Sequence, residues 1–167
     1  MNFDGIDNLK ERWPQFQAKV RSWNLRHFSA DEFILLRTPW EGPEYYPPHP
    51  ALADNLKHTA HLADEIRHKW GSPVKVISGY RPPMYNDKAI EGSDSSMHVI
   101  CGALDLRPVG EFDLQEWISH VEGIVAEKRR HDAFSIGLGR YWEDDDRFIH
   151  IDTGYYTYNR NWHIPQS

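Results

Sequence analysis

The stretch from Ser96 to Asp105 contains two side chains that suit a zinc ion. His98 offers an imidazole nitrogen and Asp105 offers a hard carboxylate oxygen. On one continuous helix this spacing would separate them by roughly 10 Å along the axis, whereas ligand atoms about 2.0–2.2 Å from one zinc ion must converge within about 3–4 Å. The chain must therefore turn between them. We expect the turn at Cys101-Gly102, because glycine accepts backbone angles that other residues resist.

A third ligand is available in the alternating segment 148–152. Ile149 and Ile151 point to one face of this predicted strand. The other face carries Phe148, His150 and Asp152. With His150 added, the set has three protein ligands and one open position, which is typical of a catalytic zinc site. By residue type alone, the alternative that these histidines are ordinary polar residues, among ten in the chain, stays open.

Four motifs in order link these residues to a known family. They are His27-Phe-Ser-x-x-Glu-Phe33, Ser78-Gly-Tyr-Arg81, the set Ser96, His98, Ala103 and Asp105, and Phe148-Ile-His-Ile-Asp-Thr-Gly154. Together they resemble the zinc D-Ala-D-Ala carboxypeptidases of the M15 peptidases, over roughly residues 27–162. Small members of that family act on bacterial cell-wall peptides, and their fold is shared with hedgehog zinc domains and lysostaphin-type peptidases.

The resemblance implies roles for particular residues. It implies that His98, Asp105 and His150 hold Zn²⁺. The family arginine that corresponds to Arg81 holds substrate near the scissile bond, often by its terminal carboxylate. A planar guanidinium matches a carboxylate with two parallel hydrogen bonds. Ser96 either binds substrate or only hydrogen-bonds the turn.

The sequence departs from the family pattern at two positions. The family glycine three residues after the metal histidine is Cys101 here, and Gly102 follows it, so the turn is expected to be shifted. Related enzymes often place the general base three residues before the last metal histidine, where this chain has Arg147. Others have His-x-His, and the first of those positions is Phe148. The general base therefore cannot be assigned by position.

Asp152 is our first candidate for the general base, because it shares a strand face with His150. An equally weighted alternative is that its carboxylate orients the imidazole of His150. Asp146, in the acidic run 143–146, is the next candidate.

Composition limits the class of protein. A chain of 167 residues is most simply one domain, and a hydrophobic fraction of 40% with seven Trp argues against disorder. The net charge of −6 argues against nucleic-acid binding. One cysteine excludes an internal disulfide. The acidic start lacks the apolar core of a signal peptide, and no run approaches the ~20 apolar residues of a membrane span. We expect a protein made in the cytoplasm without membrane association.

The predicted elements indicate an α+β fold, with a small antiparallel sheet packed with helices in a single domain. Residues 1–26 are expected to form an N-terminal arm in which Pro14 interrupts any long helix, and residues 27–167 the peptidase-like domain. Ser29 to Glu32 has capping-box form and predicts a short helix through Leu36. The other expected elements are a helix from Pro50 to Gly71, strands at 74–78, 103–106, 134–138 and 148–152, a helix after Asp113, and a turn at 143–146.

Three functions follow from this reading. The first is a peptidoglycan peptidase that cuts the stem peptide, as a carboxypeptidase or an endopeptidase. The second is a zinc-binding domain without catalysis, as in hedgehog proteins, which stays open because position 147 holds an arginine and not a base. The third is a structural protein, for example a phage virion component. A missing export signal fits a phage lysis enzyme or virion component, because the wall lies outside the cytoplasm.

Overall fold

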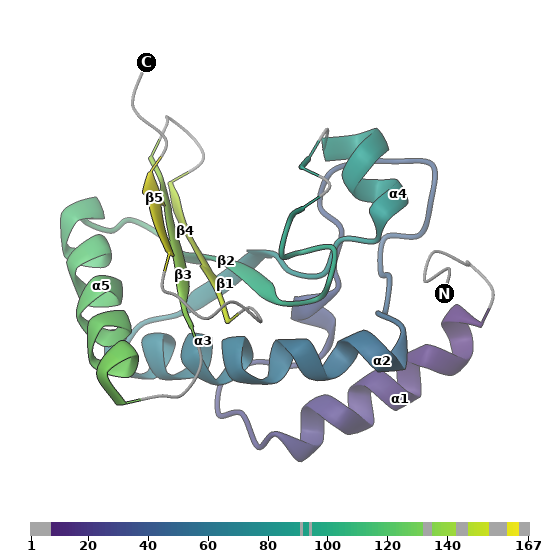
Figure 1. The fold of residues 1–167 in the computed structure, drawn as a ribbon, viewed down its shortest axis with the longest axis horizontal. Coiled ribbons are helices and arrows are strands. Elements are labelled where there is room, and N and C mark those ends of the chain that lie inside the picture. The colour runs from purple at the N-terminus through teal and green to yellow at the C-terminus, as the bar shows by residue number, and fades with distance from the viewer. Residues whose placement is uncertain are drawn as a thin grey trace.

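The computed structural model describes residues 8–90, 92–93, 95–131, 135–142, 147–153 and, for the backbone alone, 160–163. The helices are α1 (Leu9–Ser22), α2 (Pro50–Ala53), α3 (Lys57–Trp70), α4 (Pro83–Tyr85) and α5 (Leu114–His131), with 3-10 turns at Asp31–Phe33 and Asp54–Leu56 and a π-helical turn at Asn86–Ile90. The strands are β1 (Val74–Ser78), β2 (Ala103–Pro108), β3 (Gly137–Tyr141), β4 (Phe148–Asp152) and β5 (Arg160–His163). Helices pack beside one sheet (Figure 1), which confirms the α+β prediction.

The sheet has the strand order β1-β2-β4-β3-β5. The pairs β1–β2, β2–β4 and β4–β3 are antiparallel, as expected. β5 pairs with β3 in parallel. Alternation gives the sheet two different faces. One face packs into the core beside α3 and carries Leu104, Leu106, Ile149 and Ile151, all essentially buried. The opposite face of β2 and β4 is therefore available for polar side chains.

The predicted helix from Pro50 to Gly71 is present as α2, a 3-10 turn and α3 in direct succession. His49 caps its start, where Pro50 needs no N–H partner. Gly71 ends it with a φ of 76°, the left-handed conformation that favours glycine. Asp113 likewise caps α5, because its side chain accepts a hydrogen bond from the Glu116 N–H at 2.9 Å.

Three expectations about local structure were wrong. Pro14 does not interrupt α1, because it lies exposed near the helix start, where water can solvate the carbonyl group that loses its partner. The predicted helix through Leu36 is only the turn Asp31–Phe33. Glu32 does bond back to Ser29, but the chain then pairs with the segment around Tyr45. The predicted strand at 134–138 begins instead at Gly137 and runs to Tyr141.

The N-terminal segment contributes to the same core as the rest of the chain. Phe16, Val20 and Trp23 are buried there, while the boundary at residue 26 stays a prediction. The predicted turn at 143–146 lies outside the described residues. None of the described helices is both long enough and apolar enough to span a membrane.

Candidate metal centre

A tight turn between β1 and β2 carries His98. The turn is closed by hydrogen bonds from the Cys101 N–H to the His98 carbonyl (3.1 Å) and from the Gly102 N–H to the Met97 carbonyl (2.8 Å). The residue in the left-handed region is Cys101, with a φ of 59°. The turn lies at Cys101-Gly102, as expected, but the residue with the left-handed backbone is the cysteine and not the glycine. A buried cysteine thus takes a left-handed conformation that favours glycine, at an expected cost of about 1–2 kcal/mol.

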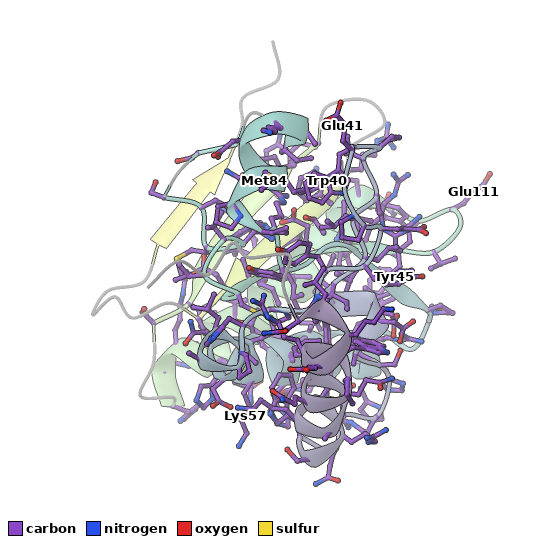
Figure 2. The ribbon with its side chains drawn as sticks, turned by 90° about the vertical axis from the view of Figure 1, so that its right-hand side faces the viewer. Trp40, Glu41, Tyr45, Lys57, Met84 and Glu111 are labelled. Carbon is purple, nitrogen blue, oxygen red and sulfur yellow. The ribbon has the colours of Figure 1, made fainter. Side chains whose placement is uncertain are left out.

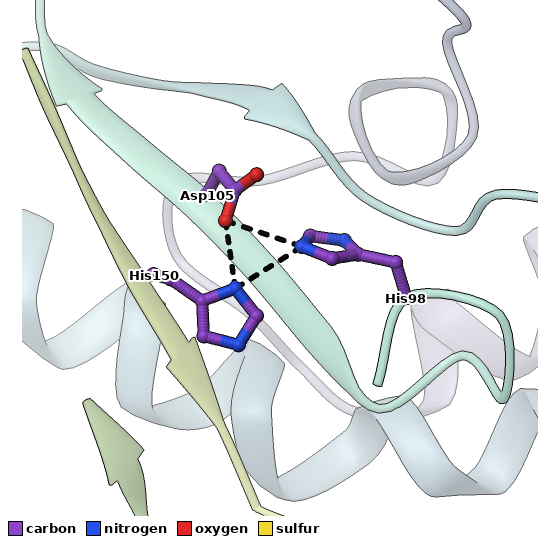
Figure 3. A group of neighbouring side chains, drawn as sticks. All are labelled: His98, Asp105 and His150. Carbon is purple, nitrogen blue, oxygen red and sulfur yellow. Dashed lines mark hydrogen bonds and ion pairs between the residues drawn. The ribbon is translucent and has the colours of Figure 1, made fainter. Parts of the chain in front are cut away.

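Strand pairing brings the other two side chains together. Asp105 on β2 lies directly opposite His150 on β4, so both project from the face of the sheet that does not carry the leucines. The three candidate ligand atoms then converge (Figure 3). His98 Nε2 lies 3.2 Å from Asp105 Oδ1 and 3.1 Å from His150 Nδ1, and the latter two atoms are 2.9 Å apart. These distances match what one small cation requires of its ligands.

Each of the three side chains is oriented by a further hydrogen bond. The Nδ1–H group of His98 donates to the Gly79 carbonyl at 2.7 Å, which leaves Nε2 facing the cluster. The Nε2–H group of His150 donates to Asp152 Oδ2 at 3.2 Å, which leaves Nδ1 facing it. Arg81 Nη2 donates to Asp105 Oδ2 at 3.0 Å, which leaves Oδ1. Such outer partners fix the ring orientation and tautomer of metal ligands.

The electrostatics of the cluster favour a bound cation. Burial lowers the pKa of His98, although Asp105 opposes the shift. Burial alone would raise the pKa of Asp105, but the neighbouring His98 and His150 hold it well below its usual range. For His150, burial is outweighed by hydrogen bonds to Asp105 and Asp152, which raise its pKa to about 9. The carboxylate is therefore ionised, and a metal ion would displace a proton from His150.

The cluster lines a cavity of about 490 Å³. Ser93, Ser95 and Ser96 form part of its wall, and Tyr141 and Phe148 form another part. The two aromatic rings stack with their centroids 4.4 Å apart. The Ser96 hydroxyl accepts a hydrogen bond from the His98 N–H at 3.3 Å. Ser96 thus both supports the turn and borders the cavity, so its two predicted roles remain compatible.

The candidates for the general base lie in different situations. Asp152 is fully buried and bonded to His150 on the side of the imidazole away from Nδ1, and it is also one of the residues that line the cavity. Its space exists because Gly137 lies opposite it on β3, where a Cβ atom would overlap the carboxylate. Asp146 lies outside the described residues.

Sequence reasoning missed the residues that hold the turn against α3. The Thr59 hydroxyl donates to the Gly102 carbonyl at 2.8 Å and lies 2.7 Å from the Thr153 hydroxyl. The Asn55 amide donates to the Ile100 carbonyl at 2.8 Å. A signal was present, because Thr59 adjoins the apolar positions of α3, where a hydroxyl requires a partner.

A separate cavity of about 400 Å³ lies between the segment 39–42 and α4. Trp40, Glu41 and Met84 border it and lie close together at one side of the molecule (Figure 2). None of its lining residues belongs to the metal cluster. It therefore adds nothing to the chemistry of the candidate centre.

Comparison with known proteins agrees with the geometry. No curated protein matches this chain. The family model described as Peptidase M15 matches residues 26–152, a range that includes Arg81 and the three converging side chains. The chain thus belongs to the peptidase M15 family.

Proposed function

We propose that this protein is a zinc-dependent peptidase that hydrolyses peptide bonds in the stem peptides of bacterial peptidoglycan. The family is one of metallopeptidases. The observation that carries the proposal is the convergence of three buried ligand atoms, from His98, Asp105 and His150, beside a cavity large enough for a peptide segment. The choice of peptidoglycan rests on the motif resemblance.

The donor set fits a zinc ion. Two imidazole nitrogens and one carboxylate oxygen match the ligand types of catalytic zinc sites. All three come from buried side chains whose other polar atoms are already hydrogen-bonded. A bound zinc ion supplies Lewis acidity: it polarises a carbonyl oxygen and makes water acidic enough to act as a nucleophile near neutral pH.

We infer that Asp152 orients His150 and does not act as the general base. Its Oδ2 is bonded to His150 Nε2, on the far side of the ring from the cluster. The other carboxylate that lines the cavity, Asp105, is a proposed ligand. The proton from water must reach the leaving amine through another group. Asp146 therefore remains the candidate for the general base.

A non-catalytic zinc protein, for example a phage virion component, is the alternative. Its support is the arginine at position 147, where related enzymes carry the base. Such a protein would keep the three metal ligands and the groups that hydrogen-bond to them, but it would not hydrolyse peptide bonds.

The test is digestion of purified peptidoglycan by the zinc-loaded protein, with mass analysis of the released peptides. Cleavage that a chelator abolishes and zinc restores is expected. His150→Ala is the control, because it removes one proposed ligand. A protein that binds one equivalent of zinc and releases no peptide would contradict the peptidase proposal and favour the non-catalytic alternative.

A further inference from the structure

Two histidines meet outside the metal cavity, and we call their side chains the histidine pair. His27 follows α1 in the chain, and His68 lies in the last turn of α3. His27 Nε2 lies 3.3 Å from His68 Nδ1, although the two residues are 41 positions apart in the sequence. His68 is exposed and His27 is half-buried. Water and small ions can therefore reach both rings.

The two facing nitrogens are committed only to each other. Within the part of the chain that the structure describes, the contact between the rings is the one hydrogen bond that either imidazole makes. In such a bond one ring donates its N–H group and the other accepts it with a lone pair. A metal ion can take the place of this proton, because both nitrogens then act as ligands.

The separation of the nitrogens suits one transition-metal ion. Imidazole nitrogens bind zinc at about 2.0–2.1 Å, and two such ligands in a tetrahedral arrangement lie about 3.3 Å apart. The histidine pair already has this separation. The ring planes differ by 26°, and rotation about the broad χ2 torsion of histidine can aim both lone pairs at one ion. Binding therefore requires no movement of the backbone.

The backbone of His27 is fixed against α3, the helix that carries the other ring. Its N–H group donates to Asp64 Oδ1 at 2.8 Å, and its carbonyl accepts from Arg67 Nη1 at 2.9 Å. His68 follows Arg67 directly on the same helix. The two Cα positions are thus held in place before an ion arrives, and this preorganisation lowers the entropy cost of binding.

The charges beside the histidine pair do not oppose a cation. Two arginines adjoin His27, and each of them is matched by a carboxylate. Arg26 Nε lies 3.0 Å from Asp64 Oδ2, and Arg67 Nη1 lies 4.0 Å from Glu32 Oε1. A divalent ion at the histidine pair would therefore meet balanced charges.

The donor atoms restrict which ions can bind. Imidazole nitrogens suit Zn²⁺, Ni²⁺ and Cu²⁺, whereas Mg²⁺ and Ca²⁺ require oxygen ligands. Among the described residues, only the cluster of His98, Asp105 and His150 unites three metal-binding side chains. The histidine pair would complete its coordination with water. With two protein ligands in place of three, it should bind an ion more weakly than the cluster does.

We propose that His27 and His68 form a second metal site, for a divalent transition-metal ion of the class that imidazole prefers. The bound ion cross-links the segment after α1 to α3. The site does not depend on the proposed peptidase function, because neither histidine lines the metal cavity. His27 opens the first of the four sequence motifs, and the metal centre makes no use of it.

The test is calorimetric titration of the metal-free protein with Zn²⁺. A tight class of site is expected from the cluster, and a weaker class of about one further equivalent from the histidine pair. His27→Ala and His68→Ala should each weaken the second class by at least about 10-fold and leave the first unchanged. Loss of a direct ligand should cost no less affinity than loss of an outer partner, which costs about 10–100-fold.

Two further variants serve as controls. His58→Ala should leave both classes unchanged, because His58 is another exposed histidine of α3 and lies about 15 Å from His68 along the helix axis. His150→Ala should abolish the tight class and keep the second. In nuclear magnetic resonance spectra of the unmodified protein, the imidazole signals of His27 and His68 should shift as the second equivalent binds.

Two results would overturn the second site. One is the absence of a second class of zinc binding in the unmodified protein. The other is a second class that survives both His27→Ala and His68→Ala, which would assign it to other surface histidines. A protein that shows only the weaker class, and loses it in these two variants, would retain the second site and contradict the zinc centre of the proposed peptidase.

Discussion

At the scale of single residues, the metal centre depends on pairs in which one side chain faces the cluster and a partner holds it. His150 and Asp152 are the clearest pair, because the aspartate bonds to the ring nitrogen away from the cluster. The Asp152→Asn variant keeps an acceptor oxygen and loses the charge. We expect its zinc affinity to fall about 10–100-fold, and its activity to return with excess zinc. Zinc titration with a competing chelator, together with rate measurements, checks this.

A loss of rate without a loss of zinc affinity in Asp152→Asn would contradict the orienting role. If Asp152→Asn keeps full zinc affinity and loses roughly 10²–10⁴-fold in rate, Asp152 takes part in proton transfer. The orienting role would then be wrong.

Gly137 offers an independent way to disturb the same carboxylate. An added methyl group at this position would overlap Asp152 Oδ2, so Gly137→Ala should displace Asp152 from His150 and weaken zinc binding by a similar factor. Gly123→Ala is the control, because nothing lies near the methyl group that it adds on α5, and it should leave zinc binding unchanged. Unchanged zinc affinity in Gly137→Ala would show that the overlap is relieved without moving Asp152.

At the scale of secondary-structure elements, the sequence predicts the helices and strands whose hydrophobic pattern reflects one buried face. Strands β2 and β4 alternate and α3 and α5 repeat every three or four residues, because one face of each packs on the core. The converging ligands follow from that alternation together with the motifs. Features that depend on long-range contacts could not be predicted. The segment after Phe33 leaves its helix to pair near Tyr45, and His27 meets His68 across an interval of 41 residues.

The link between α3 and the turn that carries His98 gives a prediction at this scale. Thr59→Val keeps the shape of the side chain and removes the hydroxyl that bonds the Gly102 carbonyl. The free energy of unfolding should fall by about 1–3 kcal/mol, because the buried Gly102 carbonyl loses the shorter of its two hydrogen bonds and keeps only the one from the Thr153 N–H at 3.4 Å. Urea unfolding measures this, and Thr59→Ser, which keeps the hydroxyl, is the control. Equal stability of the valine variant would mean that water or Thr153 replaces the bond.

At the scale of the whole molecule, Asp64 on α3 holds the segment that follows α1. Its carboxylate accepts hydrogen bonds from the backbone N–H groups of Arg26 and His27, at 2.8–3.1 Å, and from the Arg26 side chain. Burial opposes ionisation, but these bonds lower the pKa of Asp64 below its usual value of 3.8. The half-exposed Arg26 guanidinium adds little, because solvent screens it.

The sign of the resulting pH dependence follows from linkage. A lowered pKa in the folded state gives stability that is fully present above about pH 4 and is lost as the pH falls through the folded-state pKa. Asp64→Asn should therefore be less stable than the unmodified protein by about 1–2 kcal/mol at pH 7, and the difference should shrink towards pH 2–3. Urea unfolding across this range measures it. A difference that does not change with pH would show that the charge of Asp64 contributes nothing.

The metal itself should tie the turn, β2 and β4 together, so zinc should stabilise the whole fold. Zinc at 100 times its dissociation constant adds about 2.7 kcal/mol, which is about 5–10 °C in melting temperature for a domain of this size. The raised pKa of His150, about 9, stabilises the metal-free protein fully below about pH 6.5, and this contribution is lost as the pH rises through 9. Zinc competes with the same proton. The difference in melting temperature with zinc and with chelator should therefore widen between pH 6 and pH 8, and it should vanish in His150→Ala. A constant difference over this range, or one that survives the substitution, would mean that His150 is not a ligand.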